Sequence, residues 1–292
     1  HVRAVHCDHR ADDEEVYASL QRATAPLTEA WQKLKNARRI TIKFNQAFEP
    51  DRLVYIGGQL QELVSYQVAR ALLRLLRENT TAEIVCTEIS TMIHYGEHGS
   101  FDETMTLLPV LREFDVPIID GDKPPQRIAQ VPGGGSMFRQ YLLPAAAVDT
   151  DAFVSVQKMK NHHFMGITLC LKNLFGLPPL EPYGRSRAYF HHLVRLPYVL
   201  VDLGQIIRPT LNIIDALVGQ SGREWGGQGH ITDTLIAGDH VIATDACGAW
   251  LMGHEPLGDW PVPPFRRERN ALRIAHEAGF GTADLSQIDF KT

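Results

Sequence analysis

The sequence contains few cysteines and no excess of basic residues. Its cysteines, Cys7, Cys86, Cys170 and Cys247, lie far apart, so they form neither the CxxC pairs of zinc and iron–sulfur sites nor a disulfide framework. Isolated cysteines in apolar stretches are typical of core residues and indicate a reducing compartment. The formal net charge of −5 argues against a nucleic-acid partner, because such binding depends on clustered Lys and Arg.

The sequence also has no apolar run near the ~20 residues that a membrane-spanning helix needs. The longest candidate, residues 198–207, contains Asp202 and Gly204. We therefore expect a cytoplasmic protein without a membrane span. The chain begins at His1 rather than Met, so an export signal that has been removed is the alternative.

Strand-like and helix-like segments alternate along the 292 residues. The expected strands are 2–7, 39–45, 82–89, 116–120, 138–143, 151–160, 211–218 and 235–237. The expected helices are 12–36 with an interruption at Pro26, 61–79, 101–114, 167–175, one from Ala188, 243–252 and 266–278. This order predicts an α/β fold with a mostly parallel sheet and helices on both faces. Residues 1–292 form a single unit in this interpretation, as one body or two closely packed lobes, with an inserted lobe around 122–200.

Several cationic residues fall where a core would be expected, in residues 155–176. Lys158 and Lys160 are two apart on the expected strand and so share a face. Two buried neighbouring ammonium groups repel each other, which favours a sheet end where both bind an anion. The helix expected to start near Gly166 and Thr168 offers free N–H groups to the same anion, and Lys172 lies one turn later. The alternative is that the lysines point outward and pair with surface carboxylates.

Two histidine pairs add titratable groups. His162 and His163 are adjacent and cannot both face one site from a regular element, so which one does is left open. His191 and His192 follow Arg185 and Arg187, and would join the site if their segment folds over the sheet end.

Two carboxylates, Asp215 and Asp245, interrupt apolar runs. A buried carboxylate needs a partner, and pairing of Asp215 with Lys43 or Lys158 would provide one. Asp245 is suited to cap the helix that follows it.

Cofactor motifs are weak or missing. A divalent metal bound by His162, His192 and Asp215 is one hypothesis, although HExxH and HxH spacings are absent. The glycine-rich segment 218–230 suits a loop that approaches a ligand, but GxxxxGK and GxGxxG are absent, so no nucleotide site is predicted.

The segment KMKNHHFMGITLCLKNLFG, residues 158–176, resembles the signature of the domain-of-unknown-function 362 family. Residues 42–45, 211–219 and 237–256 are similar to three further blocks of that family, in the same order. The resemblance implies a fold and a set of recurrent polar residues, but no reaction. Phe44 stands where the family usually has proline, and the cysteine-rich cluster-binding segment of many relatives is missing, so no iron–sulfur cluster is expected. The recurrent polar residues are Lys43, Asn45, Glu88, Lys158, Lys160, His162, Lys172, Asn173, Asp215 and Asp245.

The leading hypothesis is a small-molecule enzyme that acts on an anionic carboxylate or phosphate metabolite by proton transfer, as an isomerase, racemase or lyase does. Its catalytic residues would be Lys158, His162 and Asp215. Its ligand-binding residues would be Lys43, Asn45, Glu88, Lys160, Thr168, Lys172, Asn173, His192 and Asp245. The alternatives are a metal-dependent oxidoreductase or redox partner with His and carboxylate ligands, and a non-catalytic binder of an anion. The sequence leaves a homo-oligomer open.

Overall fold

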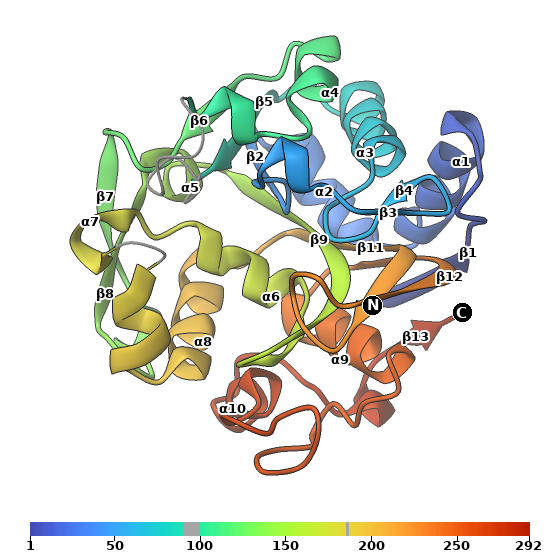
Figure 1. Cartoon of the computed structure of the whole chain (residues 1–292). Helices are drawn as coiled ribbons and strands as arrows, with labels where there is room; N and C mark the ends of the chain where they lie inside the picture. The colour runs from blue at the N-terminus through green and yellow to red at the C-terminus, as the bar shows by residue number, and fades with distance from the viewer. Residues whose placement is uncertain (90–99, 185–186) are drawn as a thin grey trace.

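A large mixed sheet forms the centre of the molecule (Figure 1). The computed structural model describes residues 1–89, 100–184 and 187–292. The strands of the large sheet are β1 (Val2–His6), β2 (Arg39–Phe44), β5 (Glu83–Glu88), β6 (Ile118–Asp120), β9 (Ala152–His162), β10 (Gly166–Thr168), β11 (Leu211–Ser221), β12 (Gln228–Gly238) and β13 (Phe290–Lys291). Two small hairpins pair β3 (Tyr55–Ile56) with β4 (Gln59–Leu60), and β7 (Gln126–Gln130) with β8 (Gln140–Pro144).

The strand order is β13-β1-β12-β11-β9-β2-β5-β6, with β10 paired to β9 outside this path. Pairing is parallel from β11 through β6 and antiparallel around β12 and β10. The predicted α/β fold with a mostly parallel sheet is therefore confirmed. β9 is a central strand, and all of its residues are buried, so both of its faces are covered, as is usual for a strand in a parallel sheet.

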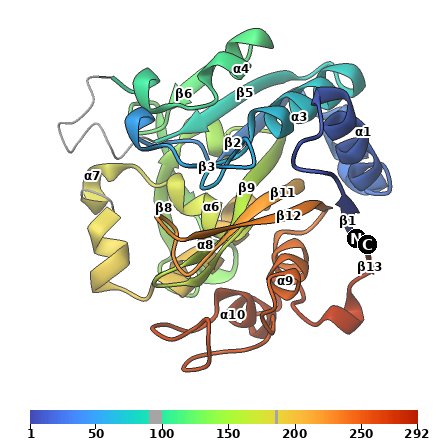
Figure 2. The same ribbon diagram turned by 45° about the vertical axis from the view of Figure 1, so that its right-hand side comes forward.

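Helices cover both faces of the sheet, and two apolar cores lie between the layers (Figure 2). One core is built on α1 (Asp13–Thr24), α2 (Thr28–Asn36), α3 (Tyr66–Asn79) and α4 (Leu108–Glu113). The other is built on α6 (Cys170–Asn173), α8 (Leu196–Ile207), α9 (Val241–Leu251) and α10 (Ala271–Glu277). The shorter helices are α5 (Ala145–Val148) and α7 (Leu180–Tyr183). No helix in the described part of the chain is both long and apolar enough to cross a membrane.

Four expected helices differ from the structure. Of the helix expected over residues 101–114, only Leu108–Glu113 (α4) is α-helical. Residues 166–168 form β10, which pairs with the end of β9, and α6 begins only at Cys170. The expected helix start near Gly166 and Thr168 was therefore wrong, because the chain first returns along β9. α3 begins at Tyr66 rather than at residue 61, and α10 begins at Ala271 rather than at residue 266. Residues 122–200, expected as an inserted lobe, contain the β7–β8 hairpin, central β9, β10 and helices α5 to α8.

Candidate functional site

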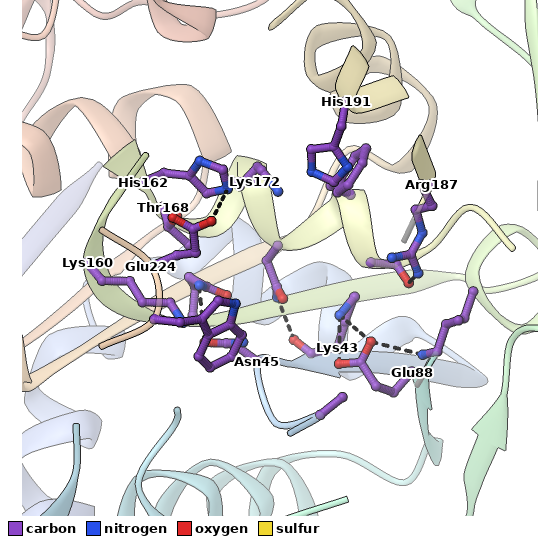
Figure 3. Close-up of a pocket in the computed structure, with 17 residues that line it drawn as sticks. Lys43, Asn45, Glu88, Lys160, His162, Thr168, Lys172, Arg187, His191 and Glu224 are labelled. Carbon is purple, nitrogen blue, oxygen red and sulfur yellow. Dashed lines mark hydrogen bonds and ion pairs between the residues drawn. The ribbon is translucent and has the colours of Figure 1, made fainter. Parts of the chain in front are cut away.

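A cavity of about 360 Å³ opens at the carboxyl ends of β2, β5 and β9 (Figure 3). Parallel α/β sheets usually bind ligands at this edge, because the polar residues that follow each strand meet there. Of the expected ligand-binding residues, those that line the cavity are Lys43, Asn45, Glu88, Lys160, Thr168, Lys172 and Asn173. His162 is the expected catalytic residue that lines it.

Lys43 and Glu88 form a buried ion pair on one wall of the pocket. The Lys43 Nζ lies 2.7 Å from Oε1 and 2.8 Å from Oε2 of Glu88. A Cβ atom at Gly176 would lie 2.5 Å from the Lys43 Nζ, so a larger residue here would displace the end of the Lys43 side chain. Asn173 on α6 donates a 2.9 Å hydrogen bond to the backbone oxygen of Lys43 and joins helix to strand. The charges of this pair largely cancel, so it contributes shape and polarity more than net charge.

Lys158 and Asp215 also form a buried ion pair, but neither residue lines the pocket. The Lys158 Nζ lies 3.1 Å from Asp215 Oδ2 and 3.2 Å from Ser65 Oγ. Both side chains are fully buried. Asp215 also accepts hydrogen bonds from the backbone N–H groups of Ser65 at 2.7 Å and Leu217 at 3.2 Å. Of the two partners expected for Asp215, the structure selects Lys158, and the pair ties β9 and β11 to the start of α3.

Besides the paired Lys43, the lysine and arginine side chains that line the pocket are Lys160, Lys172 and Arg187. The Lys160 Nζ donates a 2.7 Å hydrogen bond to the Glu62 carbonyl oxygen and lies 4.1 Å from the centre of the Trp225 ring. The Lys172 Nζ lies 4.1 Å from the Phe175 ring centre. Neither ammonium group forms a salt bridge to a described residue. Burial lowers the pKa of both lysines to about 7, partly opposed by nearby carboxylates.

His162 faces the pocket with Nε2, whereas His163 is exposed. The Nδ1 atom of His162 accepts hydrogen bonds from the backbone N–H groups of Phe164 at 3.0 Å and Met165 at 3.2 Å. The neutral ring therefore carries its proton on Nε2. Burial, followed by the charge of Lys172, holds the pKa of His162 well below its usual value. At neutral pH, His162 thus presents a hydrogen-bond donor rather than a base.

The tip between β11 and β12 supplies pocket residues that sequence reasoning did not name. Glu224 lies 3.8 Å from His162 Nε2 through Oε1 (Figure 3), and accepts a 2.9 Å hydrogen bond from the His163 N–H. Trp225 stacks on Phe48, with ring centres 4.1 Å apart. This tip lies in the glycine-rich segment 218–230. The glycine content of that segment was the sequence signal that could have indicated a loop near the ligand.

Arg187 and His191 line the far side of the pocket, over Phe175. Arg187 donates hydrogen bonds to the carbonyl oxygens of Pro178 at 2.6 Å and Gly176 at 3.0 Å. Burial lowers the pKa of Arg187 to about 10. Arg185, which the sequence places nearby, lies outside the described residues.

Two expected ligand-binding residues do not line the pocket. His192 is exposed, and its neighbour His191 lines the cavity instead. Asp245 lies inside α9, so its expected capping of that helix was wrong. It accepts hydrogen bonds from the backbone N–H groups of Cys170 at 2.9 Å and Leu171 at 2.7 Å. Asp245 therefore caps α6, which carries Lys172, and burial raises the pKa of its carboxyl group to about 7.

The residues expected to bind a metal do not come together. Among the described residues, the group of His, Cys, Asp and Glu with ligand atoms within 4.8 Å of one another is Asp8, His9 and Asp233. His162, His192 and Asp215 are not part of it. The group is internally hydrogen-bonded, with His9 Nδ1 2.8 Å from Asp233 Oδ1, and lies outside the pocket.

Comparison with known proteins agrees with the signature in residues 158–176. The model of the family described as "Domain of unknown function (DUF362)" matches residues 53–250. The chain belongs to this family. The matched range includes Lys160, His162 and Lys172, and begins after Lys43 and Asn45.

Two more distant similarities are found. A thylakoid-associated protein of Synechocystis sp. is 27% identical over 157 residues, which cover 52% of this chain and 46% of that protein. The structure of the lactate racemase apoprotein from Thermoanaerobacterium thermosaccharolyticum aligns with a TM-score of 0.46 and 12% identity, over 85% of this chain and 56% of that chain. The matched regions thus span about half the length of each of these proteins.

Proposed function

We propose that the protein is a small-molecule enzyme that binds an organic anion in this pocket and transfers a proton to or from it. The observation that carries the proposal is the pair Lys160 and Lys172. Both line one cavity, and neither forms a salt bridge to a described residue. Lys160 is buried and Lys172 is half-buried. Removing an uncompensated cation from water is costly, and a bound anion would offset that cost.

In this proposal the catalytic roles are assigned to other residues than in the sequence hypothesis. Lys158 and Asp215, expected as catalytic, are bound to each other outside the cavity, so the proposal does not use them. Burial lowers the pKa of both Lys160 and Lys172 to about 7, and a general base works best when its pKa is near the ambient pH. Lys160 already donates a hydrogen bond to the Glu62 carbonyl oxygen, so Lys172 is assigned as the acid–base group.

Because the pKa of Lys172 is about 7, its protonated form binds the anion at lower pH and its neutral form is available near pH 7. In the proposed step, neutral Lys172 takes a proton from the carbon beside a carboxylate, and the C–H electron pair moves onto a carboxylate oxygen. The Nε2–H of His162 and the Lys160 ammonium stabilise the negative charge that develops there. Return of the proton from Lys172 to a neighbouring atom gives isomerase chemistry. If the bond from the β-carbon to a leaving group breaks instead, and that group departs with the proton from Lys172, the result is lyase chemistry. Racemase chemistry requires delivery of a proton to the opposite face of the same carbon.

The first test measures binding by isothermal titration with acetate, succinate, malate, pyruvate and inorganic phosphate at pH 6. We expect Lys160→Met and Lys172→Met each to weaken binding by about tenfold or more, because a buried charge-assisted contact contributes ~1.5–3 kcal/mol. Lys33→Met, which removes an exposed lysine from α2, is the matched control and should leave binding unchanged. The proposal fails if no anion in the series binds to the wild-type protein.

The second test separates catalysis from binding. The protein is incubated with each carboxylate in D₂O, and proton NMR follows the loss of the signal from the C–H group next to the anionic group. Exchange in the wild type but not in Lys172→Met supports the proposed role of Lys172. Tight binding without exchange of any carboxylate would instead indicate a non-catalytic binding protein.

A further inference from the structure

Two polar side chains in the pocket have no hydrogen-bond partner for one of their oxygens. Gln157 Oε1 and Thr168 Oγ1 are both buried and unpartnered among the described residues. The side chains of Gln157 and Thr168 are only 2% and 6% exposed, and both line the cavity. A buried polar atom without a hydrogen bond is unfavourable, so this arrangement favours a ligand that supplies the missing hydrogen bonds.

Gln157 lines the cavity, and one hydrogen bond holds its amide. Its Nε2 donates to Asn45 Oδ1 at 3.3 Å, which leaves the amide oxygen as an acceptor. An ionised carboxylate oxygen cannot donate a hydrogen bond to this atom, since it is itself an acceptor. A carboxylate ligand must therefore carry a donor in addition to its anionic group.

The charges around the cavity decide which donor fits. Glu88 is paired with Lys43, which leaves Lys160, Lys172 and Arg187 against the carboxylate of Glu224 in the lining. The net positive charge disfavours a ligand ammonium group. A hydroxyl group is neutral, donates one hydrogen bond and accepts two. It can thus donate to Gln157 Oε1 and accept from the Thr168 hydroxyl.

The anionic group of the same ligand has its own partners. Lys160 and Lys172 carry ammonium groups without a salt bridge to a described residue, and His162 presents Nε2–H beside them (Figure 3). Thr168 is paired with Lys160 across β10 and β9, which places its hydroxyl next to the cationic end of the cavity. The hydroxyl and the anionic group of the ligand therefore need to be close together in the molecule.

From these contacts we infer that the substrate is a small hydroxycarboxylate, whose carboxylate binds Lys160, Lys172 and His162 and whose hydroxyl binds Gln157 and Thr168. The inference rests on the proposed function, because it assigns the substrate class of the same pocket. Residues that recognise a hydroxyl discriminate strongly against an analogue that lacks it, since binding of that analogue leaves their buried polar atoms unpaired.

The test compares matched pairs of acids that differ by hydroxyl groups, by isothermal titration at pH 6. The pairs are glycolate with acetate, glycerate with propionate, and malate with succinate. We expect the hydroxylated member of at least one pair to bind about tenfold or more tightly to the wild type. Gln157→Leu and Thr168→Val should each reduce this preference, while the affinity for the acid without a hydroxyl stays within about twofold.

The acid without a hydroxyl serves as the internal control for folding, because a misfolded variant loses both members of a pair. Two variants are used so that one can be tested if the other does not fold. Equal binding of both members of every pair to the wild type would overturn the inference and leave the proposed anion site standing. A hydroxyl preference that survives in both variants would also overturn it. Failure of every acid and of inorganic phosphate to bind would refute the proposed function itself.

Discussion

Lys158 and Lys160 lie two residues apart on β9, and both are almost completely buried, yet their surroundings differ. Lys158 binds the carboxylate of Asp215, whereas Lys160 binds only a carbonyl oxygen and an aromatic ring. A buried cation that is paired with a carboxylate has a structural role, because its charge is already balanced within the protein. A buried cation without a carboxylate partner remains electrostatically unsatisfied, and this property distinguishes a ligand-binding lysine from a structural one.

The largest expected effect is a loss of stability when one partner of the buried Lys158–Asp215 ion pair is removed. Lys158→Met leaves the Asp215 carboxylate buried without its cation, and breaking a buried pair from one side typically costs ~3–5 kcal/mol. We expect a loss of this size in the free energy of unfolding, measured by urea titration. At pH 7, Lys160→Met is the matched control on the same strand and should cost less than about 1 kcal/mol, because no carboxylate loses its partner.

A second variant tests the cause of that loss. Lys158→Met combined with Asp215→Asn removes both charges, so it should recover part of the stability lost in the single variant. If Lys158→Met and Lys160→Met destabilise the protein equally, the proposed distinction between a structural and a ligand-binding lysine is wrong.

Sequence reasoning could not separate these two lysines. Both lie on the same face of one strand, and both precede the same turn. Their partners are set by the pairing of β9 with β11, whose register shifts between the Asp215 and Gln220 positions. Such a shift is a three-dimensional feature of the sheet and leaves no local sequence pattern.

The sheet and its polar edge were predictable, because alternation of strands and helices and the positions of Lys43, Glu88 and Lys160 are local properties. The remainder of the pocket was not. Glu224 and Trp225 reach it from a distant hairpin, and neither has a motif that would identify it. The choice between His162 and His163 depends on the turn into β10, which was expected to be a helix.

The second expected effect is a difference in how stability depends on pH. Burial lowers the pKa of Lys160 in the folded protein to about 7, from 10.5. Between these values the unfolded chain binds a proton that the folded protein lacks, so stability rises as pH increases through this window. The gain is at most about 1.4 kcal/mol per pH unit.

This gain is measured from urea titrations of the ligand-free protein at pH 7 and pH 9. Lys160→Met removes the titrating group, so its stability relative to the wild type should fall by about 2 kcal/mol as pH rises from 7 to 9. Lys33→Met, on the exposed face of α2, should run parallel to the wild type. Parallel curves for Lys160→Met and the wild type would show that Lys160 keeps an ordinary pKa.

The smallest expected effect concerns Glu224, the carboxylate that raises the pKa of both uncompensated lysines. Glu224→Gln keeps an acceptor for the His163 N–H but removes a negative charge that repels the ligand. At pH 6 both lysines are mostly protonated, so anion affinity should increase by about twofold to fivefold, as expected for a partly screened charge near a binding site. Isothermal titration with malate measures the change. A weaker affinity of Glu224→Gln for malate would mean that Glu224 itself contacts the ligand. The anion would then be recognised by Lys160 and Lys172 together with the tip between β11 and β12.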